Sequence, residues 1–333
     1  MLVTADGRSA GLISGGCLES DLRERSSDVI ATGKALLVRY DSTSPADLLW
    51  GLGLGCTGIA DVLLERVSGT EECSVLEFIQ ECRRVRCACA IASPYVLTGI
   101  GGEIAGSRVF AREGITPRGG RTDDALTVAL ARACTGALSS QKSSQVRVTL
   151  PRGEAEAFIE YIPSPFSLFV FGAGPDAAPL VRMAKELGWH VTVVDWRPAY
   201  VTRESFPSAD ELVLARPEET RDAFAVPRGA AAVIMTHNFD SDVALVRSLL
   251  ASGALFVGLL GPRAKGDLLL ERLAEEGIIP TEDDIARFHS PVGLDIGAET
   301  PEEIALAILA EIQATVRERP GTPLRQREGP IHR

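Results

Sequence analysis

Between residues 167 and 260, short apolar runs alternate with segments whose apolar positions recur at helical spacing. Continuous apolar runs are typical of strands buried on both faces, and strands that alternate with helices indicate βαβ units. The pattern therefore predicts a doubly wound parallel sheet covered by helices. The predicted strands are Ser167–Phe171, His190–Asp195, Glu211–Ala215, Ala230–Thr236 and Ala254–Leu260, and the predicted helices are Pro179–Leu187 and Asp242–Ala251.

A further helix is expected at Pro301–Ala314. Thr300 stands where an N-cap is preferred, Pro301 suits the first helical position, and acidic residues follow in the first turn. Residues 316–333 are rich in Arg, Pro and Gly and are predicted to be disordered. The domain that contains the parallel sheet is therefore expected at residues 166–315.

Residues 1–160 show a less regular pattern, which predicts a mixed α/β domain. Because Pro163 and Pro165 exclude helix and interrupt strand pairing, residues 161–165 are expected to link the two domains. One expected strand ends near Gly7, and the others are Ala35–Tyr40, Ile59–Val67, Cys87–Leu97, Ser107–Arg112 and Gln145–Leu150; the expected helices are a polar one after Cys17, Glu72–Arg84 and Asp123–Ala137.

Charge and hydropathy narrow the class of protein. The 333 residues include 45 acidic and 34 basic ones, a formal net charge of −11, which argues against a nucleic-acid-binding surface. No apolar run approaches the ~20 residues that span a bilayer, and the N-terminus lacks the layout of a signal peptide. We expect a cytoplasmic protein that binds neither nucleic acid nor membrane.

The seven cysteines include no CxxC pair, which favours reduced thiols over a disulfide framework. Cys82, Cys87 and Cys89 lie close together in the sequence, but no histidine stands near them to complete a tetrahedral metal site. The segment from Cys87 to Ala92 is predicted to be a buried strand.

The first predicted strand of the parallel sheet runs into a G-x-G-x-x-A sequence at residues 172–177, and a helix follows at once. Gly172 suits the tight turn, Gly174 leaves room for a pyrophosphate, and Ala177 permits close packing of helix on strand. Asp195 ends the next strand, where an acid that binds ribose is expected. NAD(P) is therefore a candidate cofactor.

Two residues weaken this fit to a dinucleotide. Pro175 has no backbone N–H to donate, and Asp176 places a negative charge beside the expected pyrophosphate. The alternative is a sheet that keeps the glycine turn without its dinucleotide. Arg197, two residues after Asp195, is a candidate contact to phosphate.

Three more loops follow predicted strands on the edge of the sheet where ligands bind. His237 lies in the first of these loops and is a candidate acid, base or ligand, or else a hydrogen-bonded structural residue. Asp242 is expected to cap the helix that follows. Gly261 and Arg263 lie in the second, where Arg263 and Lys265 are candidate phosphate contacts. In the third, Asp295 is either a site residue or a turn former.

Two cysteines lie in glycine-rich turns of the first domain. Cys17 follows Ser14, Gly15 and Gly16, and Cys56 follows a run that contains Gly53 and Gly55. Glycine turns bring the backbone close to a ligand and can expose the thiol that follows. The alternative is that both thiols are small buried hydrophobes, but two in the same setting favour a functional role.

Several motifs in this order resemble the XdhC/CoxI family of accessory proteins for molybdenum hydroxylases. The resemblance covers nearly the whole chain, with an XdhC-type first domain and a Rossmann-like second one. It rests on Ser14–Glu19, Gly51–Gly58, Phe171–Gly174, Asp195–Pro198, Thr236–His237, Gly258–Gly261 and Pro291–Gly297.

The resemblance implies a chaperone that binds molybdenum cofactor, assists its sulfuration by a cysteine desulfurase-type sulfurtransferase, and delivers it to a xanthine dehydrogenase or carbon monoxide dehydrogenase-type apoenzyme. It makes Cys17 and Cys56 candidate molybdenum ligands, and the glycine loops candidate donors to phosphate and pterin. A persulfide relay through one of these thiols is a weaker variant of this hypothesis. A homodimer is expected. Family members usually carry a helix and a strand before the equivalent of Met1, so the first domain is expected to lack them.

The alternative is an NAD(P)-dependent oxidoreductase that uses the second domain. The sequence favours a non-catalytic carrier, because His237 is its one evident acid for hydride-transfer chemistry and the distinctive residues lie in the first domain. A purely structural adaptor would leave both cysteine loops without a role.

Overall fold

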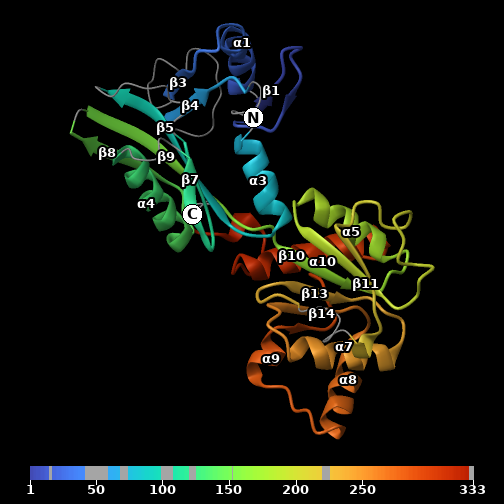
Figure 1. Cartoon of the computed structure of the whole chain (residues 1–333). Coiled ribbons are helices and arrows are strands. Elements are labelled where there is room, and N and C mark those ends of the chain that lie inside the picture. Colours follow the sequence, from blue (N-terminus) through green and yellow to red (C-terminus); the bar gives the residue numbers. More distant parts are fainter. Residues whose placement is uncertain are drawn as a thin grey trace. The chain divides into compact units, whose positions relative to one another are not determined.

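The computed structural model describes residues 1–14, 17–41, 59–67, 74–98, 108–119, 125–151, 153–219 and 226–329. The chain forms two compact units, Met1–Ser164 and Pro165–Arg333 (Figure 1). Each unit has its own sheets and its own apolar core.

The second unit is built on a six-stranded parallel sheet. Its strands lie in the order β12-β11-β10-β13-β14-β15, and every pairing is parallel. Counted along the chain this is 3-2-1-4-5-6, the Rossmann order, which confirms the predicted doubly wound sheet. The strands are β10 (Ser167–Phe171), β11 (His190–Asp195), β12 (Glu211–Leu214), β13 (Ala231–Ile234), β14 (Phe256–Leu259) and β15 (Phe288–His289).

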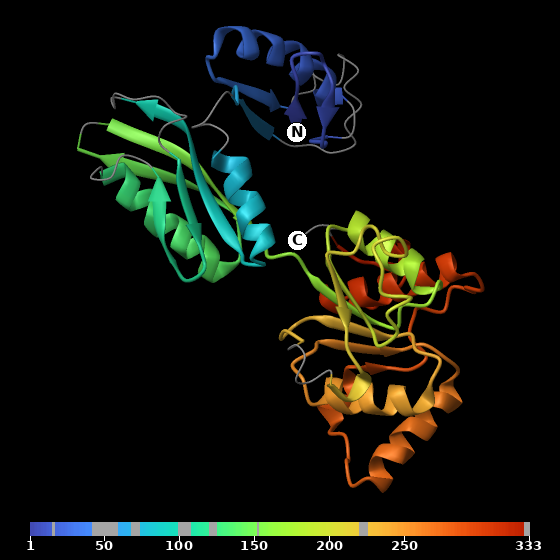
Figure 2. The same ribbon diagram turned by 45° about the vertical axis from the view of Figure 1, so that its right-hand side comes forward.

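Helices cover both faces of this sheet (Figures 1 and 2). Strand β10 is buried on both sides: Leu168 and Val170 pack into the core under one pair of helices, and Phe169 and Phe171 into the core under the other. That burial explains why its sequence is apolar without alternation. The first pair is α5 (Ala177–Glu186) and α10 (Pro301–Val316), and the second is α7 (Phe239–Leu250) and α8 (Arg263–Glu275).

The first unit holds a five-stranded antiparallel sheet in the order β7-β6-β5-β9-β8. Its strands are β5 (Cys89–Thr98), β6 (Val109–Arg112), β7 (Ile115–Gly119), β8 (Ser144–Leu150) and β9 (Gly153–Ile162). Helix α4 (Ala125–Ser140) packs on one face and α3 (Ser74–Arg84) on the other. The remaining elements are β1 (Leu2–Val3), β2 (Ser9–Ala10), α1 (Cys17–Thr32), β3 (Leu36–Asp41) and β4 (Ile59–Leu64).

Strand β9 was not predicted from the sequence, which indicated no strand between residue 150 and the linker. Its last two residues, Tyr161 and Ile162, were expected in the linker but pair with β5. Inward positions alternate with glutamates along β9, and two of the inward residues are Ala155 and Ala157. Alanine and glutamate are both depleted in strands, so the composition hid a period-two pattern.

The start of helix α10 follows the expected chemistry. Thr300 caps α10, as the sequence predicted, and the structure adds a capping box with Glu303. After α10, the segment predicted to be disordered is described to residue 329 and contains the short 3-10 helix η4 (Leu324–Gln326). No helix in the described ranges has the length and apolar character needed to cross a bilayer.

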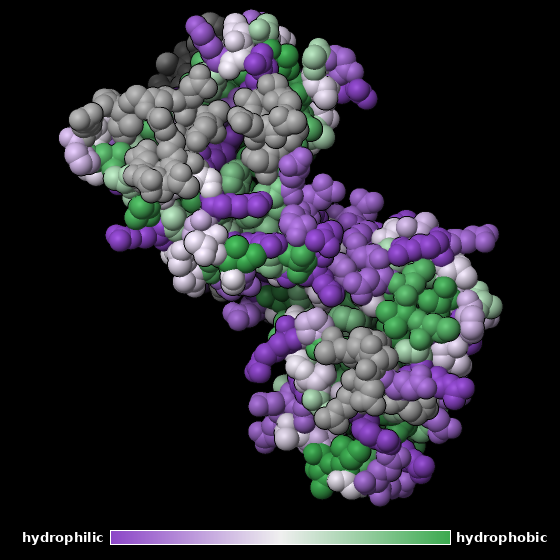
Figure 3. Space-filling view, in the orientation of Figure 1, coloured by the Kyte–Doolittle hydropathy of each residue, from purple (hydrophilic) through white to green (hydrophobic). Residues whose placement is uncertain are grey.

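Large apolar side chains, among them Leu12, Ile279 and Leu324, are exposed on both units. Figure 3 shows apolar patches interspersed with hydrophilic side chains on one face of the molecule. Scattered apolar exposure is normal for folded proteins. We therefore assign no docking role to these residues.

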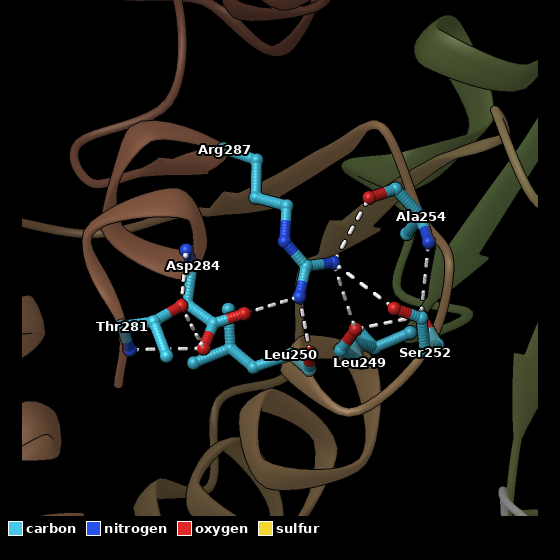
Figure 4. Close-up of polar contacts among 7 residues, drawn as sticks. All are labelled: Leu249, Leu250, Ser252, Ala254, Thr281, Asp284 and Arg287. Atoms are coloured by element: carbon cyan, nitrogen blue, oxygen red, sulfur yellow. Dashed lines mark hydrogen bonds and ion pairs between the residues drawn. The ribbon is translucent and has the colours of Figure 1, made fainter. Parts of the chain in front are cut away.

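Arg287 joins three segments of the second unit (Figure 4). Its guanidinium donates to the carbonyls of Ser252 and Ala254 at 3.2 and 3.0 Å, to that of Leu250 at the end of α7, and to Asp284. Asp284 belongs to α9 (Glu282–Ala286) and closes the capping box at its start. Arg287 therefore supplies donors to carbonyls that the end of α7 leaves unpaired.

We predict that Arg287→Lys lowers the free energy of unfolding by about 1–2 kcal/mol, because one ammonium cannot reproduce the planar fork that reaches these oxygens. Urea unfolding of the full chain measures the change. Arg272→Lys is the matched control, since Arg272 is exposed and pairs with Glu275 and Glu276 on its own surface. Equal losses in the two variants would contradict the role given to Arg287.

Candidate functional site

The site begins at the glycine turn after β10. Gly172 has φ of +115°, and a Cβ there would lie 2.7 Å from the carbonyl oxygen of Met235, just after β13. Its N–H donates to the carbonyl of Val194 at 2.8 Å. Glycine is therefore required at this point, where the chain crosses between β11 and β13. In a sheet of this order, the gap between β10 and β13 is the switch point at which ligands bind.

Asp195, at the end of β11, accepts hydrogen bonds from other groups of the protein with both of its carboxylate oxygens. One carboxylate oxygen accepts from the N–H of Ala173 at 2.7 Å and from Nη2 of Arg197 at 2.7 Å. The other accepts from the N–H of Arg197 at 2.9 Å and its Nε at 3.0 Å. The carboxylate thus fastens the glycine turn to the end of β11, and its side chain is fully buried.

These bonds keep Asp195 ionised. Burial by itself raises the pKa of Asp195, but the hydrogen bonds from Arg197 and from the backbone of Ala173 outweigh it, so the pKa lies below its ordinary value. The Arg197 guanidinium also lies 4.1 Å from the ring centre of Tyr200 and 5.1 Å from that of Trp196. Asp195 and Arg197 therefore form one fixed unit beside the turn.

Asp176 fills the space that Gly174 leaves open. A Cβ on Gly174 would lie 2.3 Å from a carboxylate oxygen of Asp176 and 3.9 Å from Nε2 of His237. The other Asp176 oxygen lies 3.7 Å from the same nitrogen. Among the described residues Asp176 accepts no N-cap hydrogen bond from α5. A carboxylate therefore stands where a dinucleotide would bring its pyrophosphate.

A buried ion pair lies at the ends of β13 and β14. Lys265 Nζ is 2.6 Å from an oxygen of the fully buried Asp242 and donates to the carbonyl of Leu260 at 3.1 Å. Thr236 donates to the second Asp242 oxygen. Burial raises the pKa of Asp242, and the hydrogen bonds from Lys265 and Thr236 offset part of that rise. The Lys265 side chain lies against Gly261: a Cβ on Gly261 would be 2.8 Å from Cδ of Lys265.

This pair corrects two expectations. The N-cap of α7 is Asn238, whose side chain accepts from the N–H of Ser241 at 2.9 Å, so Asp242 does not cap the helix. Lys265 is directed at Asp242 and was expected to contact phosphate. The sequence held a signal for the pair: the acid Asp242 stands among the apolar residues of α7, and Lys265 follows Gly261 by four residues. This signal can be recognised only when α7 and α8 are known to be neighbours.

Two more predicted residues of the second unit, Arg263 and Asp295, follow β14 and β15. Arg263 is the first residue of α8 and is exposed, with no ion pair to any residue that the structure describes. Asp295 is exposed in the loop after β15. Glu311 of α10 fixes the start of that loop, because it contacts Nδ1 of His289 at 2.8 Å and accepts from the N–H of Gly293 at 2.7 Å.

In the first unit, the structure describes only part of the predicted cysteine loops. Ser14 donates its hydroxyl to Glu19, and Glu19 also accepts from the N–H groups of Ile13 and Ser14 at 2.8 and 2.7 Å. Ser14 thus belongs to the start of α1, whose first residue is Cys17. The predicted Gly15, Gly16, Gly53, Gly55 and Cys56, and the side chain of Cys17, lie outside the described residues.

The structure therefore brings Gly172, Gly174, Asp195, Arg197 and His237 together at one edge of the sheet. Sequence reasoning placed the charge of Asp176 beside the glycine turn, but it missed the buried pair that Asp242 forms with Lys265. In the ranges that the structure describes, no group of three or more His, Cys, Asp or Glu side chains is arranged to hold a metal ion.

Comparisons with known proteins follow the same division of the chain. The model of the XdhC Rossmann domain matches residues 168–312, and that of the XdhC and CoxI family matches residues 1–41. A Bacillus subtilis protein named as a probable subunit of xanthine dehydrogenase is 34% identical over 323 residues, which cover 95% of this chain and 87% of that protein. The uncharacterized protein YqeB of Escherichia coli is 34% identical over 155 residues, 46% of this chain and 28% of its own.

A solved structure is similar over almost the same extent. The crystal structure of a xanthine dehydrogenase from Bacillus halodurans superposes with a TM-score of 0.73 at 29% identity, covering 97% of this chain and 88% of that one. With matches in both units and a relative aligned along nearly the whole length, this chain belongs to the XdhC and CoxI family.

Proposed function

We propose that this chain is an accessory protein of a molybdenum hydroxylase of the xanthine dehydrogenase type. It binds molybdenum cofactor, assists the sulfuration of that cofactor by a cysteine desulfurase-type sulfurtransferase, and delivers it to the apoenzyme. Membership of the XdhC and CoxI family and the name of the Bacillus subtilis relative support a role connected with xanthine dehydrogenase.

The position of Asp176 carries the proposal. Its carboxylate over Gly174 would repel a pyrophosphate, whereas the pyrimidinone edge of a pterin presents N–H donors that a carboxylate accepts. The exposed imidazole of His237 beside it supplies a second polar contact. These residues fit a ligand that offers hydrogen-bond donors better than one that offers a diphosphate.

The other end of the cargo calls for different groups. Molybdenum bound by a dithiolene accepts soft thiolate ligands, for which Cys17 and Cys56 remain the candidates of this chain. In this proposal the cysteine loops of the first unit hold the metal. The chain itself performs no oxidation or reduction of a substrate.

The rival hypothesis is an NAD(P)-dependent oxidoreductase, and Asp195 argues against it. Both of its oxygens already accept hydrogen bonds from Ala173 and Arg197, so it has little capacity left for the hydroxyls of a ribose. A separate equilibrium titration of the full chain with isolated molybdenum cofactor, NADH and NADPH decides between the two. Cofactor binding without nucleotide turnover supports the carrier, and tight NAD(P)H binding with turnover and no cofactor binding refutes it.

We predict that Cys17→Ala or Cys56→Ala weakens retention of molybdenum cofactor by roughly 10-fold or more, the scale on which metal sites respond to changes in their ligand shells. Gel filtration of the loaded full chain, followed by assay of bound molybdenum, measures retention. Cys134→Ala is the matched control, because Cys134 belongs to α4 and is buried against β6. Retention equal to wild type in both loop variants would remove the thiols from the proposed site.

A further inference from the structure

The end of helix α3 brings two cysteines of the first unit together. After α3, the N–H of Cys87 donates to the carbonyl of Cys82 at 3.0 Å, and the N–H of Arg86 donates to that of Arg83 at 3.2 Å. Arg86 adopts φ of +54°. These bonds and this left-handed residue define a Schellman motif, in which the side chains at the positions of Cys82 and Cys87 commonly touch.

Packing at this turn also gathers three cysteine side chains, because Cys82 and Cys89 belong to one buried cluster and Cys87 packs against it. The three side chains pack in one apolar cluster with Phe78 and Phe110, between α3 and the five-stranded sheet. These three cysteines lie outside both glycine-rich cysteine loops.

The three cysteines differ in their access to solvent. Cys82 and Cys89 are each 1% exposed, whereas Cys87, in the turn before β5, is only half-buried. Burial raises the pKa of Cys82 and, more strongly, that of Cys89, to about 12. A reagent from solvent therefore meets Cys87 before it meets Cys82 or Cys89.

We propose that Cys82 and Cys87 are a reversible oxidation site that hydrogen peroxide converts to a disulfide. The Cys87 sulfur attacks peroxide, the O–O bond breaks, and a sulfenic acid and one water form. The Cys82 sulfur then attacks the sulfenic sulfur, and the hydroxyl leaves with the Cys82 proton as a second water. Two thiols and one peroxide thus become one disulfide and two waters.

The geometry favours this pair over the alternatives. A bond between Cys82 and Cys89 would have to begin at a thiol that solvent hardly reaches. A metal centre is disfavoured because none of the described Cys, His, Asp and Glu side chains form a suitable group of three. Cys82 and Cys87 combine contact with one accessible sulfur, which is what a two-step oxidation requires.

The test uses the reduced full chain, treated with hydrogen peroxide and then with an alkylating reagent and trypsin. Arg83, Arg84 and Arg86 lie between the two cysteines, so trypsin separates their peptides unless a disulfide joins them. We expect mass spectrometry to find the Cys82 and Cys87 peptides joined, with two hydrogens lost, and dithiothreitol to release them. Cys134, which lies in another core cluster, is expected to remain reduced.

Three variants make the assignment specific. Cys82→Ser and Cys87→Ser are each expected to abolish the joined peptides, although Cys73 shares the tryptic peptide of Cys82. Cys89→Ala is expected to retain them, since Cys89 takes no part in the bond. The proposal is overturned if peroxide leaves Cys87 reduced, converts it only to sulfinic acid, or joins either thiol mainly to another cysteine. Circular dichroism of each variant establishes that the chain is folded when it is oxidised.

Discussion

Lys265→Met is expected to lower the free energy of unfolding by about 3 kcal/mol, because it leaves the Asp242 carboxylate buried without its cation. Asp242 has no exposed side-chain surface, and Lys265 is 21% exposed. Thr236 still donates to the carboxylate in this variant, so the loss should fall at the low end for a broken buried pair. Urea unfolding of the full chain at neutral pH measures the difference.

Lys185→Met is the matched control. Lys185 Nζ also lies 2.6 Å from an aspartate, Asp210, and also donates to a carbonyl, that of Trp189. The side chains of Lys185 and Asp210, however, are 27% and 31% exposed. A solvent-exposed pair contributes about 1 kcal/mol or less. Equal losses of stability in the two variants would show that the burial of Asp242 does not increase the cost of removing its cation.

The loss in Lys265→Met is also expected to depend on pH. Because burial raises the folded-state pKa of Asp242, the stability linked to its proton is fully present below the unfolded pKa and is lost as the pH rises through the folded pKa. Removing Lys265 raises that folded pKa further. The difference in free energy of unfolding between wild type and Lys265→Met should therefore be largest at neutral pH and decrease on acidification. Adding Asp242→Asn to Lys265→Met should recover much of the lost stability.

The parallel sheet could be predicted because local and global signals agree in the second unit. Leu168 to Phe171 are apolar on both faces of β10, and Gly172 ends the strand where only glycine fits. The first unit gave weaker signals. Strand β9 is the neighbour of both β5 and β8, yet its alternation of Ala155 and Ala157 with glutamates carries little strand propensity.

Contacts between distant segments were beyond sequence reasoning. Asp242 was expected to act as a cap because it stands in the first turn of α7, and nothing local shows that Lys265 of α8 reaches it. Asp195 was expected to bind ribose, but the N–H of Ala173 and the Arg197 guanidinium occupy its oxygens. In both cases, the identity of the residue was informative, and its partner was set by the packing of the sheet.

Asp176→Gly is expected to raise the affinity of the second unit for dinucleotides above that of the wild-type chain. The change removes the carboxylate that lies over Gly174 and leaves the G-x-G-x-x-A sequence intact. Removing a charge beside the pyrophosphate should tighten NAD(P)H binding by about 10- to 100-fold, since each ~1.4 kcal/mol of repulsion relieved is tenfold in affinity. Fluorescence titration of the full chain with NADH and NADPH measures the gain.

Two controls separate the space made available from the charge removed. Asp176→Asn keeps the volume of the side chain and should recover only part of the gain. Asp240→Asn removes an exposed acid from the first turn of α7, at the same edge of the sheet, and should leave nucleotide affinity within twofold of wild type at the ionic strength of a cell, where exposed charges are screened over about 8 Å. If wild type already binds NAD(P)H as tightly as Asp176→Gly, Asp176 does not block the pyrophosphate position, and the argument for a pterin at this edge loses its support.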